Sequence, residues 1–306
     1  MNKGLIISYI AGRYSIEYND QIYYGTVRGK LKNDIIPKVG DIAEFTILND
    51  NNIIIEDIDE RINDLIRPNI CNIDQAFIIF SVKEPDLNLN LLDKFLVNLE
   101  YNNIKPIIIF NKWDLNDDDN ILKIINYYKE IGYHTLITST IEKDELIYKE
   151  IKELIKNKRS VFTGQSGVGK SSILNVLDPT LFLDTNEISI ALGRGKHTTR
   201  TVSLLKINDG YVADTPGFGT IDFSEMDEVS IADNFVEFFN YKKECKYNGC
   251  LHLNEPGCMV KKKVEDGIIL KSRYDNYLSF INDLRKDKKN DNRSLNPINK
   301  KRRFKK

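Results

Sequence analysis

The chain is poor in the features that mark secreted or membrane proteins. It contains four cysteines in 306 residues, which is too few for a disulfide scaffold. No apolar run approaches the roughly 20 residues that a helix needs to span a bilayer. The first residues lack the long apolar core of a secretory signal peptide. We therefore expect a soluble, cytoplasmic protein with no membrane attachment.

Net charge is also nearly absent, at −1, but it is unevenly distributed. Residues 285–306 contain eleven Lys or Arg and two Asp, which gives 11 − 2 = +9, so the rest of the chain carries −10. A basic tail on a mildly acidic body favours a polyanionic partner such as a nucleic acid. A disordered tail that only increases solubility is the alternative.

Residues 1–62 are predicted to form a small β-barrel. Five short runs rich in Ile, Tyr, Val and Phe are separated by turn residues such as Gly12. Five short strands in about 60 residues are typical of an OB-type barrel, a fold that often binds RNA. Four tyrosines are candidates for stacking on bases, although each could instead pack the barrel: Tyr14, Tyr18, Tyr23 and Tyr24.

After the barrel the pattern changes to strands that alternate with helices. This alternation predicts an α/β domain over residues 63–222, with a mostly parallel sheet covered by helices on both faces. Ligand-binding loops of such sheets follow the carboxyl ends of the strands. Residues 223–306 are predicted to form a helical, zinc-binding domain with helices at 229–239 and 268–284. The tail beyond Asp287 is predicted to be disordered.

A phosphate-binding loop follows one of the predicted strands. Residues 164–171 match the pattern G-x-x-x-x-G-K-[ST] and precede a predicted helix. The glycines let backbone N–H groups point inward, and the start of the helix favours phosphate. Lys170 should contact the β- and γ-phosphates, and Ser171 should bind Mg²⁺. The predicted nucleotide contacts here are Thr163, Gly164, Gln165, Ser166, Gly167, Val168, Gly169, Lys170 and Ser171.

A guanine-specific motif precedes this loop in the sequence. Asn111, Lys112, Trp113 and Asp114 match the pattern N-K-x-D. The Asp114 carboxylate can accept hydrogen bonds from N1–H and the exocyclic amine of guanine, a pair of donors that adenine does not offer. Asn111 should tie this loop to the phosphate loop, and Ser139 should lie where a backbone amide could meet the guanine O6.

Two further segments have the composition of GTPase switch loops. Asp214 and Gly217 belong to a D-x-x-G motif that follows a predicted strand. Residues 193–200 are glycine-rich and basic and end in adjacent threonines. One threonine hydroxyl could complete the Mg²⁺ shell when the γ-phosphate is present. Thr198 and Thr199 are both candidates, and we favour Thr199.

The residue after the D-x-x-G motif is unusual for a GTPase. Many GTPases place a water-orienting Gln there, but this chain has Phe218, which has no polar group. Another side chain must therefore hold the attacking water. His197 is the nearest candidate, although it could instead contact only backbone or RNA. The predicted catalytic residues are His197, Lys170 and Thr199.

A cluster of cysteines lies in the C-terminal part. Cys245, Cys250, His252 and Cys258 fit the pattern C-x4-C-x-H-x5-C. Three thiolates and one imidazole make a closed tetrahedral site, which is the arrangement of structural zinc. Unliganded buried thiols are the alternative.

The nucleotide motifs occur in a permuted order. Ordinary small GTPases have the phosphate loop, the switch loop and then the guanine motif, whereas here the guanine motif comes first. The barrel precedes these motifs and the cysteine cluster follows them. In this order of parts the sequence resembles the RsgA family of circularly permuted bacterial GTPases.

The resemblance implies a GTPase that acts in late maturation of the small (30S) ribosomal subunit. It implies binding to the subunit and its 16S rRNA, and hydrolysis of GTP to GDP and phosphate that the subunit stimulates. GTP contacts at residues 111–114 and 164–171 and zinc at the cysteine cluster also follow. Phe218 fits the family, where a hydrophobic residue occupies the glutamine position. We expect a monomer with structural zinc, and Mg²⁺ bound with GTP at Ser171 and Thr199.

Two other classes of protein stay open. A P-loop kinase for a small metabolite would not need Asp114, so nucleotide preference separates it from a GTPase. A pure RNA-binding chaperone would keep its binding without Lys170 and would show no nucleotide turnover.

Overall fold

The protein is described by a computed structural model that covers most of the chain. The described residues are 1–29, 31, 35–49, 51–65, 68–181, 202–214 and 223–294. Contacts group them into two compact units, the first within residues 1–87 and 102–220 and the second within residues 88–101 and 221–306. The predicted domain boundaries after residues 62 and 222 stay a prediction. Among the described residues, no helix has both the length and the apolar character that crossing a bilayer requires.

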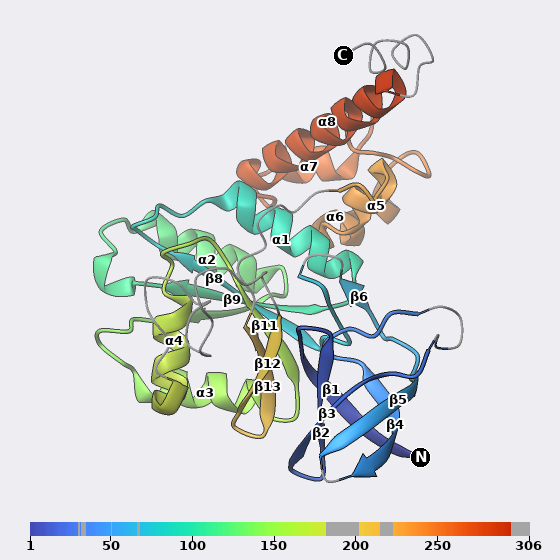
Figure 1. Ribbon diagram of the computed structural model, residues 1–306. Coiled ribbons are helices and arrows are strands. Elements are labelled where there is room, and N and C mark those ends of the chain that lie inside the picture. Colours follow the sequence, from blue (N-terminus) through green and yellow to red (C-terminus); the bar gives the residue numbers. More distant parts are fainter. Residues whose placement is uncertain are drawn as a thin grey trace, which may run out of the picture. The chain divides into compact units, whose positions relative to one another are not determined.

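The N-terminal strands form the predicted five-stranded barrel (Figure 1). They pair in the order β1-β2-β3-β5-β4, and pairing of β1 with β4 closes the barrel. Side chains that alternate along the strands, such as Ile16 and Phe45, form a buried apolar cluster inside the barrel. The strands are β1 (Asn2–Ile10), β2 (Arg13–Tyr18), β3 (Gln21–Val27), β4 (Ile42–Asn49) and β5 (Asn52–Ile58).

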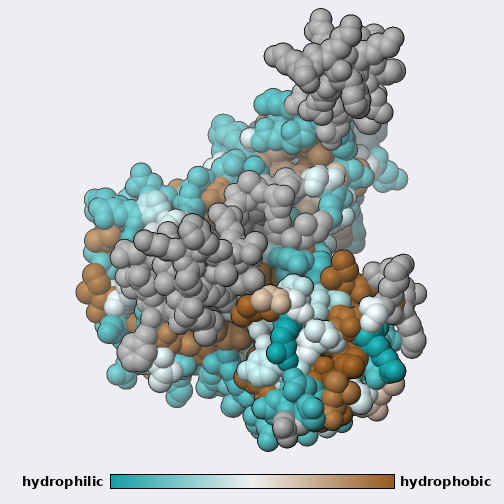
Figure 2. Space-filling view, viewed as in Figure 1, coloured by the Kyte–Doolittle hydropathy of each residue, from teal (hydrophilic) through white to brown (hydrophobic). Residues whose placement is uncertain are grey.

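Two of the tyrosines that were candidates for stacking on bases are buried in the barrel interior. Tyr14 and Tyr23 are 6% and 8% exposed and belong to the barrel core, so the stacking hypothesis is wrong for them. Tyr24 is 44% exposed, and so is Tyr9 at 43%, which the sequence pattern did not single out. Hydrophobic and hydrophilic side chains lie side by side on the barrel face seen in Figure 2.

The barrel continues directly into the sheet of the α/β part. The combined sheet has the order β10-β9-β8-β11-β13-β12-β1-β2-β3-β5-β4. Strands β8 to β11 and β13 pair in parallel, while β12 runs antiparallel to both β13 and β1. The added strands are β8 (Gln75–Ser81), β9 (Lys105–Asn111), β10 (His134–Ile137), β11 (Arg159–Thr163), β12 (Ser203–Ile207) and β13 (Gly210–Asp214).

Helices α3 (Glu145–Ile155) and α4 (Lys170–Leu177) cover one face of this sheet. Ile151 of α3 and Leu174 of α4 pack with Phe77 of β8 in one buried cluster. All seven residues of β8 are buried, as expected for a central strand of a parallel sheet. A further helix, α2 (Asn120–Glu130), connects β9 to β10. The mixed α/β class and the N-terminal barrel are therefore confirmed.

The second unit is helical and contains one element from the middle of the sequence. Helix α1 (Leu89–Tyr101) follows β8 in the chain but groups with α5 to α8. Asp93 of α1 forms an ion pair with Arg273, and Arg273 also pairs with Glu237, at 2.7 Å in each case. The other helices are α5 (Glu228–Asp233), α6 (Val236–Tyr241), α7 (Met259–Glu265) and α8 (Lys271–Ser294).

The helix predictions for this unit were right in kind and wrong in extent. The single helix predicted over residues 229–239 is two helices, α5 and α6, with a break at Asn234 and Phe235. Helix α7 was not predicted. Helix α8 reaches Ser294, so the chain stays helical past Asp287, where disorder was predicted to begin.

Candidate nucleotide-binding site and metal cluster

The predicted nucleotide motifs lie at one edge of the sheet. Strand β9 ends at Asn111, β11 ends at Thr163, and β13 ends at Asp214. These strands are parallel, and only β8 separates β9 from β11 in the sheet. The carboxyl ends of parallel strands meet at the same edge, which is where such sheets bind ligands.

Asn111 connects the guanine motif to the phosphate loop, as predicted. Its side chain is fully buried, and its Nδ2 donates to the Val168 carbonyl at 2.8 Å. Its Oδ1 accepts from the Thr138 hydroxyl at 2.9 Å. A β-carbon at Gly169 would lie 2.3 Å from Asn111 Nδ2, so only glycine fits beside this bridge. The amide therefore fixes the distance between the two loops.

Ser139 holds the side chain that is expected to bind guanine. The Ser139 hydroxyl donates to Asp114 Oδ1 at 2.6 Å. The same oxygen accepts from the backbone amides of Ile141 and Glu142, at 3.2 and 3.1 Å. Because its lone pairs are used in this way, the hydroxyl proton is directed at Asp114. Sequence reasoning assigned Ser139 a backbone contact, and the structure adds this role for its side chain.

The phosphate loop is shaped by close backbone approaches. Gly164 has a φ of +142°, and a β-carbon there would lie 2.0 Å from the Ile79 carbonyl oxygen of β8. A side chain at this position would force the loop away from the sheet. The following residues include half-buried Gln165, exposed Ser166 and Gly167, and buried Val168. The loop ends at Gly169, and Lys170 begins α4.

Lys170 lies inside the curve of this loop. Its ammonium donates to the Gly164 carbonyl at 2.7 Å and also to the Gln165 carbonyl. Burial lowers the pKa of Lys170 to about 8. Ser171 follows at the start of α4 and is 5% exposed. A hydroxyl oxygen is a ligand that Mg²⁺ accepts beside phosphate oxygens, so the position fits the predicted metal role.

The lowered pKa of Lys170 predicts that GTP affinity falls as pH rises. The pKa lies below the ordinary 10.5, so free protein loses the Lys170 proton near pH 8, whereas phosphate binding favours the ammonium. Between pH 7 and 8.5 we expect GTP affinity to fall roughly fourfold relative to Lys170→Arg, whose guanidinium keeps its proton. Fluorescence of Trp113, the single tryptophan, can measure binding. Parallel pH profiles for both proteins would contradict the prediction.

The loop after β8 borders the site and was missed in the sequence. Lys112 donates from its Nζ to the Glu84 carbonyl. The Pro85 Cδ lies 3.9 Å from the β-carbon position of Gly167 in the phosphate loop. The amide of Val82 donates to the Asn111 carbonyl at 3.0 Å. The only available signal was position, because loops that follow neighbouring parallel strands gather at one edge.

Several predicted site residues lie outside the described residues. They are His197, Thr198, Thr199, Gly217 and Phe218, together with the rest of residues 193–200. Asp214 is described as the last residue of β13, without its side chain. Trp113 and Asp114 form a single 3-10 turn, η2 (Trp113–Leu115), after Lys112 in the left-handed conformation. The guanine and phosphate loops are thus described, and the switch segments are not.

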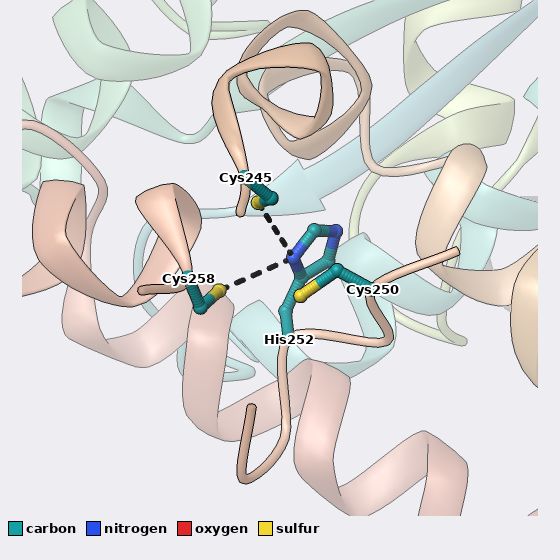
Figure 3. Close-up of side chains that lie close together, drawn as sticks. All are labelled: Cys245, Cys250, His252 and Cys258. Carbon is teal, nitrogen blue, oxygen red and sulfur yellow. Dashed lines mark hydrogen bonds between the residues drawn. The ribbon is translucent and has the colours of Figure 1, made fainter. Parts of the chain in front are cut away.

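The four predicted zinc ligands come together in the second unit (Figure 3). Cys245 follows η4 (Lys242–Glu244), Cys250 and His252 lie in the next loop, and Cys258 caps α7. All four ligand atoms lie within 4.8 Å of one another. His252 Nδ1 is 3.7 Å from Cys245 Sγ and 3.3 Å from Cys258 Sγ.

These distances fit a tetrahedral metal ion. Zinc with ordinary bond lengths separates a ligand nitrogen from a ligand sulfur by about 3.5 Å. Burial lowers the pKa of His252, which favours the neutral imidazole that binds metals. Backbone amides of Met259 and Lys261 donate to the sulfurs of Cys245 and Cys258 at 3.3 and 3.5 Å. The donor set is therefore compatible with structural zinc.

The phosphate loop, the guanine loop and their permuted order define the class of protein. The fold is that of a circularly permuted P-loop GTPase with an N-terminal β-barrel. The chain belongs to the RsgA family: residues 58–224 match the RsgA GTPase and residues 3–55 match the RsgA N-terminal domain.

Similar proteins cover almost the whole chain. Small ribosomal subunit biogenesis GTPase RsgA 2 of Oceanobacillus iheyensis is 46% identical over 288 residues, covering 93% of this chain and 98% of the relative. Small ribosomal subunit biogenesis GTPase RsgA of Bacillus subtilis is 44% identical over 298 residues, covering 94% of this chain and 99% of the relative. The crystal structure of YloQ, a circularly permuted GTPase, aligns with a TM-score of 0.80 at 38% identity and covers 94% and 96%. YjeQ from Thermotoga maritima aligns with a TM-score of 0.80 at 33% identity and covers 92% and 98%.

Proposed function

We propose that this protein acts in late maturation of the small ribosomal subunit, as a GTPase that the subunit stimulates. It binds GTP, hydrolyses it to GDP and phosphate, and leaves the subunit after hydrolysis. One observation carries the proposal: Asn111 joins the guanine loop to the phosphate loop through the Val168 carbonyl. The 46% identity to a protein named for small-subunit biogenesis supports the choice of partner.

The described residues account for nucleotide binding. Asp114, oriented by Ser139, accepts from the guanine edge and excludes adenine. Backbone amides of the phosphate loop and the Lys170 ammonium hold the phosphates, and Lys170 offsets charge that develops on the γ-phosphate. Mg²⁺, held by Ser171 and Thr199, would neutralise further phosphate charge when bound. Positioning and electrostatics supply most of the catalysis in this reaction class.

The partner surfaces belong to both units. We propose that the barrel, with exposed Tyr9 and Tyr24, contacts 16S rRNA, and that the basic tail over residues 285–306 assists. Zinc bound by the cysteine cluster has a structural role, because four protein ligands leave no open position for chemistry. The protein acts as a cytoplasmic monomer.

The test is GTP turnover with and without purified small ribosomal subunits. We expect turnover by wild type to rise on adding subunits, and we expect no turnover above background by Lys170→Ala. ATP should not replace GTP as the substrate, and large subunits should not replace small subunits as the stimulating partner. A preference for ATP would instead favour a metabolite kinase. Subunit binding that is equal in wild type and Lys170→Ala, with no turnover by either, would favour an RNA chaperone.

His197 is proposed to orient the attacking water, because Phe218 cannot do so. His197→Ala should slow single-turnover hydrolysis on saturating subunits by roughly 10²–10⁴-fold while GTP affinity stays within a factor of about two. The control is His134→Ala, which removes an imidazole from β10 and should hydrolyse GTP at the wild-type rate. His252→Ala is unsuitable because it removes a predicted zinc ligand. Equal rates for His197→Ala and wild type would assign the water to rRNA or to another switch residue.

A further inference from the structure

The hairpin of β12 and β13 occupies a special place in the chain. Residues 193–200, the predicted first switch, precede β12, and the predicted second switch starts at Asp214, where β13 ends. Any displacement of this hairpin therefore moves one end of both switch segments. The contacts that hold the hairpin can therefore affect the rate of GTP hydrolysis.

The turn of the hairpin is fixed to the GTPase part of the sheet. Asn208 Nδ2 donates to the Lys152 carbonyl in α3 at 2.8 Å, and the Tyr211 amide donates to the Lys158 carbonyl at 2.8 Å. A β-carbon at Gly210 would lie 1.9 Å from the Ile155 carbonyl oxygen, so the turn approaches the end of α3 closely. These contacts hold the turn of the hairpin against the end of α3.

Strand β12 of the hairpin is the neighbour of barrel strand β1 in the sheet (Figure 1). Strand β12 pairs with β1, with Ser203 opposite Ser8. Lys206 Nζ lies 2.8 Å from Glu17 Oε1 of β2 and 3.1 Å from Asp20 Oδ1. Glu17 thus links a barrel strand to β12 across a short backbone pairing.

The charge of Glu17 also acts on the second strand of the hairpin. Lys206 and Tyr211 lie opposite each other in the β12–β13 pairing. Burial raises the pKa of Tyr211, and the nearby charge of Glu17 raises that pKa further. One carboxylate of the barrel therefore forms an ion pair with β12 and acts electrostatically on a side chain of β13.

The exposed fractions of the Glu17, Asp20 and Lys206 side chains show which of the two carboxylates holds Lys206. The Asp20 side chain is 91% exposed, so its ion pair with Lys206 contributes little in water. The Glu17 side chain is 14% exposed, and that of Lys206 is 46% exposed. The largely buried Glu17 carboxylate is therefore the better fixed member of this ion pair.

We propose that Glu17 and Lys206 are positioning residues that couple binding of the barrel on the small subunit to the switch segments through the β12–β13 hairpin. This inference rests on the proposed function. When the barrel docks on the subunit, a change in its orientation displaces the hairpin through the Glu17–Lys206 ion pair. The displaced hairpin then moves the adjoining ends of both switch segments. Neither residue belongs to the nucleotide motifs, so the coupling affects the stimulated reaction and spares the basal one.

The test compares Lys206→Met and Glu17→Gln with wild type. Glu17→Gln keeps the size of the side chain, Lys206→Met keeps most of its apolar length, and both remove the ion pair. We expect subunit-stimulated turnover to fall about fivefold in each, while GTP affinity and basal turnover stay at wild-type values. The double variant should lose no more than either single variant, because both remove the same interaction. Lys206→Arg, which restores the charge, should recover stimulation.

A matched control is available within the barrel. Lys3 forms the same kind of exposed ion pair, 2.7 Å from Asp59 and 3.2 Å from Glu44, and has no partner in the hairpin among the described contacts. Lys3→Met should keep full stimulation. Wild-type stimulation in both hairpin variants would overturn the inference, as would an equal loss of basal turnover. Absence of stimulation in wild type itself would overturn the proposed function.

Discussion

Asp114→Asn should lower GTP affinity by at least roughly a hundredfold and make xanthosine triphosphate the preferred nucleotide. Two hydrogen bonds from guanine to a charged carboxylate are lost, and each such bond is worth about 1.5–3 kcal/mol. The Ser139 hydroxyl donates to Oδ1 at this position. In the variant it would hold the amide oxygen, so the amide NH₂ would face the base. The amide NH₂ cannot accept a hydrogen bond from the guanine amine, but it can donate one to the carbonyl that xanthine has at the same position.

Competition binding with GTP, xanthosine triphosphate and ATP measures this exchange. Asp119→Asn is the control, since Asp119 is exposed, precedes α2 and makes no side-chain capping bond. It should bind all three nucleotides as wild type does. Ser139→Ala should weaken the preference for GTP without reversing it, because the carboxylate stays charged but loses its orientation. Undiminished GTP affinity in Asp114→Asn would place the guanine site elsewhere.

Removal of zinc should unfold the loop between Cys245 and Cys258 and destabilise the second unit. Binding of structural zinc contributes about 10–16 kcal/mol in small zinc modules, which is comparable to the whole stability of a domain. The cluster cysteines also belong to the apolar core of this unit, beside Phe238 and Tyr277. We expect the thermal midpoint to fall by roughly 10–20 °C after chelation or in Cys258→Ser.

Mass spectrometry of the native protein gives the metal content, and hydrogen exchange locates the loss of structure. We expect one zinc per chain in wild type, and faster exchange over residues 242–265 after its removal. Cys71→Ser supplies the control, because Cys71 lies in the first unit, where its thiol contacts Asp41 at 3.0 Å. That variant should keep its zinc. Native protein without stoichiometric zinc would refute the assignment.

The nucleotide and metal motifs could be recognised in the sequence because their chemistry restricts it locally. Gly164 and Gly169 are needed where the backbone approaches Ile79 and Asn111, and no other residue fits there. The four cluster ligands lie within 14 residues of sequence, from Cys245 to Cys258. Such motifs are visible in the sequence because each is a short run of residues whose types are set by the ligand, even where a glycine packs against a distant residue.

Contacts between residues far apart in the chain have no comparable pattern in the sequence that would predict them. Helix α1 has the apolar periodicity of a helix that covers a sheet, but Asp93 pairs with Arg273, which is 273 − 93 = 180 residues away. Nothing near Asp93 in the sequence indicates that partner. The same holds for Glu17 and Lys206. The break between α5 and α6 was missed because Asn234 and Phe235 do not include the Gly or Pro that usually mark a helix end.

The shared sheet of barrel and GTPase also sets an order for folding during synthesis. The barrel strands pair with near neighbours and are complete once Ile58 has been made. Strand β12 must instead find β1 across 203 − 8 = 195 residues. Contacts of such separation form late, and N-terminal parts fold first as a chain emerges. The finished barrel thus serves as the template on which the last strands of the GTPase sheet are added.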